Sequence, residues 1–203
     1  MQTFGAAFLQ SAIKRLSYYK KLGDKTFAQL DESDFHFQPN AESTSMAIII
    51  QHMAGNMLSR WTDFLTTDGE KEWRNRDAEF EEQNLSKKQL LDLWEKGWNC
   101  CLGTLAALTE EDLLKTIYIR NEGLLVVDAI NRQLAHYPYH VGQIIYVGKI
   151  IKNKNWHNLS IAKGNSDDFA NINNLTNMVW IMRQLPVNGI NHQQAFITNI
   201  NCF

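Results

Sequence analysis

Apolar residues recur along much of the chain at the three- and four-residue spacings of amphipathic helices. The first helix is predicted over about residues 3–30, from an apolar stripe formed by Phe8, Ala12, Leu16, Tyr19 and Leu22. Pro39 prevents a smooth continuation, because proline lacks an amide proton and restricts the residue before it. The second helix is predicted from Ser43 or Thr44, either of which can cap it, to about Thr66.

The clearest helix start is the capping box Ser86–Gln89, in which the side chains of both end residues satisfy free backbone amides. The third helix is predicted from this box to about Leu108. Gly97 lies within it, and because glycine weakens a helix, we expect a close contact with another helix at this position.

Two short runs, 115–119 and 124–126, flank residues 120–123 and predict a small β-hairpin with Gly123 in its turn. The fourth helix is predicted over Val127–Ile151. The expected fold class is therefore all-α, with four helices and one hairpin before the last of them.

Two stretches depart from this helical pattern. The mostly charged segment 68–82 lies between the second and third helices, a connection longer than the two to about eight residues usual in bundles. We interpret it as a strap across the helices, with a mobile lid as the alternative. Between 170 and 203 the only charged side chain is Arg183. The pattern predicts a domain over 1–169 and an asparagine-rich extension over 170–203, whose stripe at 175–185 can form a short helix and from which no chemistry is expected.

Composition narrows the class of protein. Of the 203 residues, 44% are hydrophobic and 21% are charged, as in soluble globular proteins. The net charge of −2 gives no basic surface for nucleic acid, and no apolar run approaches the roughly 18 residues of a membrane span. The residues after Met1 carry no positive cluster, so no signal peptide is expected. The three cysteines (Cys100, Cys101 and Cys202) form no disulfide framework, and we expect a cytoplasmic protein.

Candidate chemistry is concentrated in histidines. His136 and His140 are four residues apart, so they project from one face of the fourth helix and can occupy adjacent positions around a metal ion. The alternative is a pair of polar residues on a half-exposed face. Pro138 between them predicts a kink, with or without a role in aiming the two rings. His52 lies within the stripe of the second helix, where it is either a core histidine or the natural third ligand.

Three segments carry a resemblance to a known superfamily: 51–56 on the second helix, 60–64 just beyond it, and 134–143 on the fourth. In order and helical placement they resemble the DinB-like metal-dependent four-helix bundles, over about residues 1–169. The resemblance implies an up-down-down-up bundle, a metal triad of His52, His136 and His140, and frequent homodimers. Characterised relatives include transferases and isomerases that use low-molecular-weight thiols.

Three neutral imidazoles would leave the full charge on a zinc or nickel ion and at least one coordination position open, as in catalytic sites. Such an ion lowers the pKa of a bound water or holds a thiol as its thiolate. Four polar residues are expected to line the pocket: Asn56, Arg132, Gln133 and Gln143. Each is otherwise an ordinary interface or surface residue.

Two hypotheses follow from this site. The first is a metal-dependent enzyme, either a thiol S-transferase with a low-molecular-weight thiol or a hydrolase. The second is a non-catalytic, stress-associated metal-binding dimer. A metal site open to solvent favours the enzyme, whereas a site sealed by Trp61, Tyr137 and Tyr139 favours the second hypothesis.

Overall fold

The computed structural model describes residues 2–161, and one compact unit comprises Met1–Leu159. Within the described residues the long elements are four helices: α1 (Phe4–Phe27), α2 (Met46–Trp61), α3 (Lys87–Ala107) and α4 (Val126–Lys152). The antiparallel strands β1 (Thr116–Ile119) and β2 (Glu122–Leu125) directly precede α4. Four single-turn 3₁₀ helices occupy connections, at Ser33–His36, Asp77–Phe80, Glu110–Asp112 and Asn153–Asn155. The predicted boundary at 169 and the extension over 170–203, with its stripe, lie outside the described residues.

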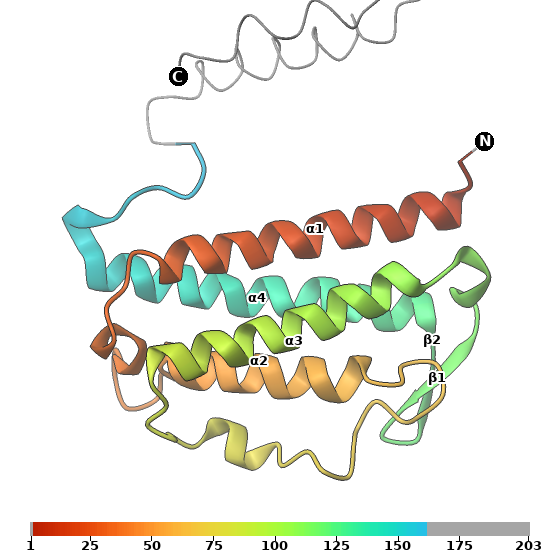
Figure 1. The fold of residues 1–203 in the computed structure, drawn as a ribbon, viewed down its shortest axis with the longest axis horizontal. Helices are drawn as coiled ribbons and strands as arrows, with labels where there is room; N and C mark the ends of the chain where they lie inside the picture. The colour runs from red at the N-terminus through yellow and green to blue at the C-terminus, as the bar shows by residue number, and fades with distance from the viewer. Residues whose placement is uncertain (1, 162–203) are drawn as a thin grey trace, which may run out of the picture. The chain divides into compact units, whose positions relative to one another are not determined.

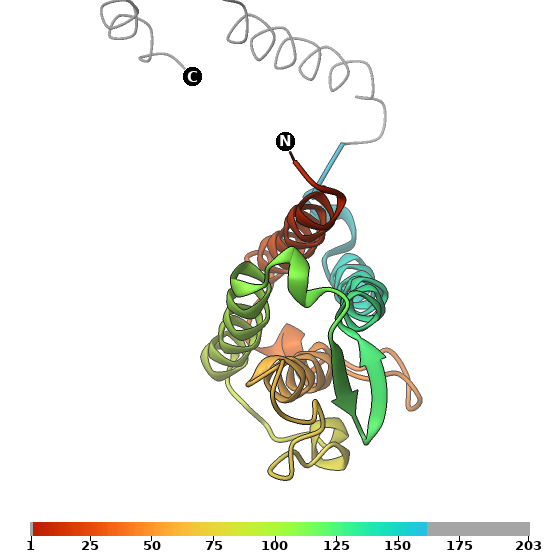
Figure 2. The ribbon, with the colours of Figure 1, turned by 90° about the vertical axis from the view of Figure 1, so that its right-hand side faces the viewer.

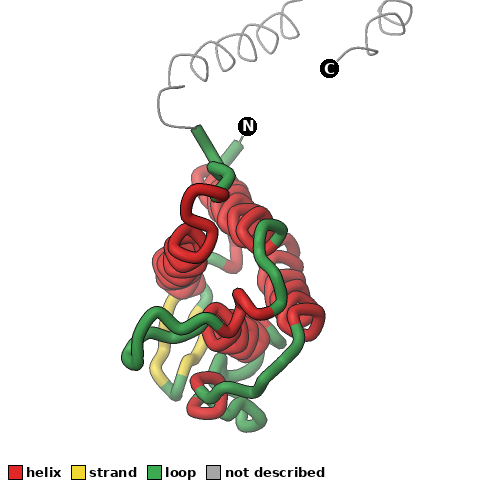
Figure 3. Tube along the Cα trace, turned by 90° about the vertical axis from the view of Figure 1, so that its left-hand side faces the viewer, coloured by secondary structure: helices red, strands yellow, loops and turns green. Residues whose placement is uncertain are grey.

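The four helices lie alongside one another, with α1 and α4 running in one direction and α2 and α3 in the other (Figure 1). Helix α1 packs against α4 and α3, and α2 packs against α3 and α4. The end-on view places the β-hairpin beside the start of α4 (Figure 2). From the opposite end, strands are seen only in this hairpin among the described residues (Figure 3). The interior is filled by large side chains, including Trp61, Trp94, Trp98 and Tyr137.

Local hydrogen bonds explain where the helices begin and end. The capping box at Ser86 is confirmed, since its hydroxyl accepts from the Gln89 amide and the Gln89 side chain accepts from the Ser86 amide. The predicted caps of the second helix, Ser43 and Thr44, were one or two residues too early. Ser45 is the residue whose hydroxyl caps α2. Ser43 is instead held in a turn, where its amide donates to the Asn40 side chain. Helix α2 also ends before Thr66, at Trp61.

The predicted hairpin is confirmed, but the role given to Gly123 was wrong. Arg120 and Asn121 form the turn, with positive φ angles of 55° and 63° that suit the right-handed twist of a hairpin. Gly123 instead pairs with Tyr118 inside β2. The close contact predicted at Gly97 is confirmed, since a Cβ there would lie 3.1 Å from the Cα of Ala54.

The connection from α2 to α3 is a strap that is bound to α2 along its length. The Ser59 hydroxyl donates to the Gly69 carbonyl at 2.8 Å, and the Gln51 amide donates to the Glu81 carbonyl at 3.0 Å. These bonds start from buried residues of α2, so the segment is packed in place rather than free to open as a lid. Among the described residues, none of the helices combines the length and the apolar character needed to cross a membrane.

Candidate metal centre

Helices α2 and α4 bring the three predicted histidines together. His52 comes from α2, and His136 and His140 come from successive turns of α4. Each ring offers one nitrogen such that the three nitrogens lie within 4.8 Å of one another. The Nε2 atoms of His136 and His140 are 3.0 Å apart. The three histidines thus form one group, as expected, and α4 continues through Pro138 between His136 and His140.

The hydrogen-bond partners of each α4 histidine favour one tautomer of its ring. The Nδ1 atom of His136 is 3.2 Å from the side-chain oxygen of Gln133, and that of His140 is 2.8 Å from the oxygen of Gln143. An amide oxygen can only accept, so both Nδ1 atoms must donate. Neutral imidazole carries one proton, and both Nε2 atoms therefore present lone pairs.

His52 is held in the same tautomer by a carboxylate. Its Nδ1 atom lies 3.0 Å from Glu79 Oε2, and Glu79 in turn accepts two bonds from Arg74, at 2.7 and 2.8 Å. The side chains of all three are buried, with exposed fractions of 8% for His52, 10% for Glu79 and 2% for Arg74. A carboxylate behind a ligand histidine fixes its orientation and makes it a better donor to a metal.

The space for Glu79 is made by a glycine on α2. A Cβ at Gly55 would lie 2.2 Å from Glu79 Oε1, so no larger residue fits unless the carboxylate moves. The strap therefore delivers Glu79 to the back of His52 through a gap in the α2 surface. The sequence analysis did not select Glu79 or Arg74, because the strap has no helical periodicity that would show which of its many charges turn inward.

Burial and neighbouring charges lower the pKa values of the two α4 histidines, His136 and His140, and keep both rings neutral. Burial, together with His140, His52, Arg132 and Arg60, lowers the pKa of His136 from 6.5 to about 4. Burial and His52 also lower the pKa of His140, against the opposing effect of its bond with Gln143. Burial raises the pKa of Glu79, but bonds from Arg74 and His52 outweigh it, so its pKa lies below the usual value and it is a carboxylate.

These residues fit a divalent cation that accepts imidazole nitrogen. Nitrogens at about 2.0–2.1 Å from a tetrahedral zinc ion lie a little over 3 Å apart, which is close to the 3.0 Å between His136 and His140. The group contains no carboxylate ligand, so the charge of a bound ion would not be offset. The three backing groups, Gln133, Gln143 and Glu79, all accept from Nδ1 and leave Nε2 for the ion.

The four predicted pocket residues have different positions. Gln133 and Gln143 hold the ligands themselves, as described above. Asn56 is buried, one turn beyond His52, and its side-chain oxygen accepts a 3.0 Å bond from the Tyr137 hydroxyl. That hydroxyl accepts from the Trp61 indole at 2.9 Å. Arg132 is exposed at the start of the α4 segment that carries the ligands.

Aromatic side chains cover the site only in part. Phe80 packs on His52, with ring centroids 4.7 Å apart, and is itself 38% exposed. Tyr139 packs edge-on against His140, with ring centroids 4.8 Å apart, and is 60% exposed. Trp61 and Tyr137 are buried, and the Tyr137 hydroxyl connects the Trp61 indole to Asn56. His136 and His140 remain only partly buried. Solvent therefore reaches the α4 side of the site.

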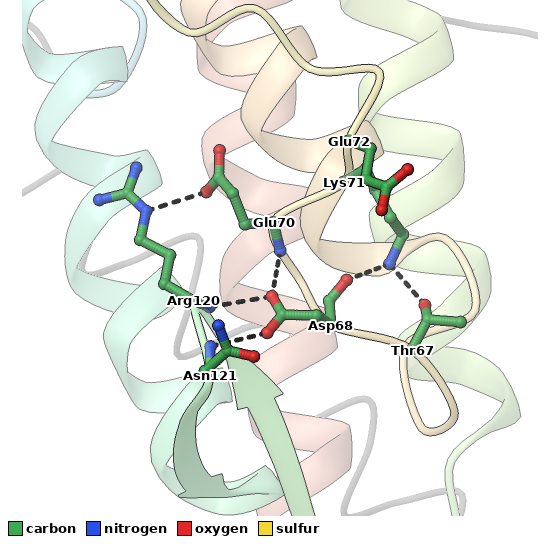
Figure 4. Close-up of a pocket in the computed structure, with 7 residues that line it drawn as sticks. All are labelled: Thr67, Asp68, Glu70, Lys71, Glu72, Arg120 and Asn121. Atoms are coloured by element: carbon green, nitrogen blue, oxygen red, sulfur yellow. Dashed lines mark hydrogen bonds and ion pairs between the residues drawn. The ribbon is translucent and has the colours of Figure 1, made fainter.

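A separate cleft, of about 690 Å³, lies between the strap and the hairpin turn (Figure 4). Its polar groups bind one another: the Asp68 carboxylate accepts the backbone amides of Arg120 and Asn121, at 2.9 and 2.8 Å. The Glu70 carboxylate accepts from the Arg120 side chain at 3.2 Å. None of the three histidines lines this cleft, and its contacts serve to fasten the strap to the hairpin.

The fold and the site define a mainly helical protein with a group of three histidines. His52 is buried and backed by the Glu79 carboxylate, and the other two histidines are half-buried. The sequence matches the model of the family described as "Protein of unknown function (DUF1572)" over residues 3–165, and the chain belongs to this family. No curated protein matches the sequence.

Proposed function

We propose that the protein binds one divalent metal ion, zinc or nickel, through Nε2 of His52, His136 and His140. The observation that carries the proposal is the convergence of the three rings: one nitrogen of each lies within 4.8 Å of the others. The Nδ1 atom of each ring lies within hydrogen-bond distance of a side-chain oxygen, which supports a proton on Nδ1 and a lone pair on Nε2. A metal-binding histidine usually binds the ion through one ring nitrogen and donates the N–H of the other to a carbonyl or carboxylate. A histidine of an ordinary core needs only one hydrogen-bond partner, and its free ring nitrogen has no reason to lie beside those of other histidines.

We further propose that the protein is an enzyme. A divalent ion held by three neutral imidazoles lowers the pKa of a bound thiol or water, which suits thiol S-transfer or hydrolysis. The partial exposure of His136 and His140 supports substrate access and counts against the sealed site expected of a non-catalytic binder. Phe80 and the strap exclude water from the His52 side, and Glu79 holds that ring in place.

The resemblance to DinB-like bundles belongs to the same proposal. The opposite directions of α1 and α4 against α2 and α3 support an up-down-down-up four-helix bundle. The low-molecular-weight thiol, the homodimer and the cytoplasmic location are proposed on that resemblance alone. Light scattering of the purified chain tests the dimer directly.

Elemental analysis of the purified full chain tests the metal. We expect close to one zinc or nickel per chain in the wild type, and none in His136→Ala. His157→Ala is the matched control, because this histidine is exposed at the end of the described unit. Far-UV circular dichroism should show that all three proteins are folded. A wild type without metal after incubation with both ions would contradict the proposal, as would a His136→Ala protein that retains it.

A further inference from the structure

A second set of polar groups lies on one side of the histidines. Helices α2 and α4 are in contact and run in opposite directions, so residues after His52 on α2 lie beside residues before His136 on α4. Asn56 and Arg60 follow His52 by one and two turns, and Arg132 precedes His136 by one. At 1.5 Å per residue, Arg60 is about 12 Å from His52 along the helix axis. Burial lowers the pKa of Arg60, and the charges of Arg74 and Arg132 lower it further, so Arg132 lies near enough for its charge to reach Arg60.

The orientation of the Asn56 amide is set by its neighbours. The Trp61 indole can only donate, so the Tyr137 oxygen accepts from it and the Tyr137 hydroxyl donates to the Asn56 oxygen. This chain of bonds uses the acceptor of the Asn56 side chain. Its NH₂ group is left as a donor, on the residue one helical turn after His52.

Arg60 is a buried cation whose bonding is incomplete. Its Nη1 atom donates to the Gly69 carbonyl at 2.6 Å and to Glu70 at 3.2 Å. Its Nε atom is buried and has no hydrogen-bond partner among the described residues. A buried N–H without a partner is rare and costs free energy, so it requires an explanation. The Nε edge of a guanidinium is one that a carboxylate can bind with both oxygens.

Positive charge exceeds negative charge on this side of the site. Glu70 is shared by three arginines, at 3.2 Å from Arg60, 3.4 Å from Arg74 and 3.2 Å from Arg120. Glu79 balances only Arg74. Arg132 is exposed and makes no ion pair within residues 2–161. The Asp68 carboxylate also feels the charge of Arg60. The four arginines (Arg60, Arg74, Arg120 and Arg132) thus face three carboxylates (Asp68, Glu70 and Glu79), and the excess positive charge can accept an anion.

We propose that Arg60, Asn56 and Arg132 form a carboxylate-binding subsite of the metal centre. The thiol or the electrophile that the site accepts then carries a carboxylate one to two helical turns (about 5–11 Å) from the atom at the metal. This inference rests on the proposed metal function, and it adds the substrate class: a small anionic molecule rather than a neutral one.

Two matched thiols test the subsite in the cobalt-reconstituted full chain. 6-Mercaptohexanoate and 6-mercaptohexan-1-ol differ only in the carboxylate, and binding of either sulfur to cobalt produces near-ultraviolet charge-transfer absorption. We expect the wild type to bind the carboxylate at least about 10-fold more tightly than the alcohol, or about 1.4 kcal/mol. Arg60→Gln and Arg132→Gln should each lower that ratio toward one without weakening the alcohol. Arg15→Gln, which removes an exposed cation from α1, should leave it unchanged.

Failure of the metal proposal and failure of the subsite proposal would give different results. If no cobalt spectrum develops, the metal proposal is wrong and the subsite falls with it. A normal cobalt spectrum with equal affinity for the two thiols overturns the subsite alone, as does a ratio that neither arginine variant lowers. Arg60 is buried, whereas Arg132 is exposed. If Arg60→Gln does not fold, the result for Arg132→Gln decides the outcome.

Discussion

The Nε2 atoms of His136 and His140 face each other at 3.0 Å, while the Nδ1 atom of each ring lies within hydrogen-bond distance of a glutamine side-chain oxygen. Two unprotonated nitrogens at this distance repel each other, whereas a proton or a cation shared between them removes the repulsion. One helix holds both rings, one turn apart, and Gln133 and Gln143 restrain their orientation. The spacing on α4 therefore suits an ion that accepts both nitrogens.

The first prediction concerns pH. The folded-state pKa values of His136 (about 4) and His140 are lowered below the ordinary 6.5, mainly by burial. The unfolded chain thus binds more protons between pH 6.5 and 4, and stability is lost as the pH falls through this window. Urea denaturation of the metal-free protein at pH 7, 5.5 and 4.5 should show this loss. His136→Gln should reduce the slope, and an equal slope in the variant would show that other groups cause it.

The second prediction concerns Glu79. Glu79→Ala removes the acceptor behind His52 and should weaken metal binding by about 10–100-fold, as measured by competition with a chromogenic chelator. Glu79→Gln keeps an acceptor for the ring but not the charge, so its loss should be smaller.

Both Glu79 variants also leave Arg74 with only the more distant Glu70, at 3.4 Å. Removing one member of a buried ion pair typically costs about 3–5 kcal/mol, and Glu79→Ala should approach the lower end of this range in urea denaturation. Glu81→Ala is the control, because this exposed residue makes its hydrogen bonds through its backbone carbonyl and amide, which the substitution keeps. Unchanged metal affinity in Glu79→Ala would refute the role given to the carboxylate.

The third prediction compares two glycines. A Cβ at Gly55 would collide with Glu79, whereas a Cβ at Gly142, on α4 beside His140, meets nothing within 4 Å. Gly142→Ala should therefore stabilise the protein by roughly 0.5–1 kcal/mol through helix propensity, with metal affinity unchanged. Gly55→Ala should weaken metal binding despite the same gain in propensity. Equal metal affinities in the two variants, measured with the same chelator, would show that the strap can shift at no cost to the site.

The fourth prediction concerns the Tyr137 hydroxyl. Tyr137→Phe leaves the buried Trp61 indole N–H without an acceptor and should cost about 1–3 kcal/mol in urea denaturation. Metal content should remain, because Tyr137 touches none of the ligand nitrogens through its hydroxyl. Tyr146→Phe removes an exposed hydroxyl from the same helix and should change stability by less than about 0.5 kcal/mol. A loss of metal in Tyr137→Phe would show that Asn56 helps to position the ligands.

The sequence predicts best those features that depend on residues close to one another along the chain. The apolar stripe of α1 and the capping box at Ser86 follow from spacings of three and four residues, which helix geometry converts directly into one face or one cap. The pairing of His136 with His140 is of the same kind. Turn positions were less accurate: Gly123 was placed in the hairpin turn because glycine usually supplies positive φ, but Arg120 and Asn121 adopt it here.

Long-range features depended on the tertiary structure. Nothing in the spacing of the strap distinguishes Glu79 from the charges around it, because a segment without regular periodicity has no predictable inner face. The contact between Glu79 and His52 requires the space that Gly55 leaves on α2. It also requires the buried Arg74 side chain, which binds the same carboxylate. The sequence by itself therefore determined the helices and the candidate ligands, through local geometry. The tertiary structure alone decided the proton positions on those ligands and the carboxylate behind them, since both depend on groups that only packing brings together.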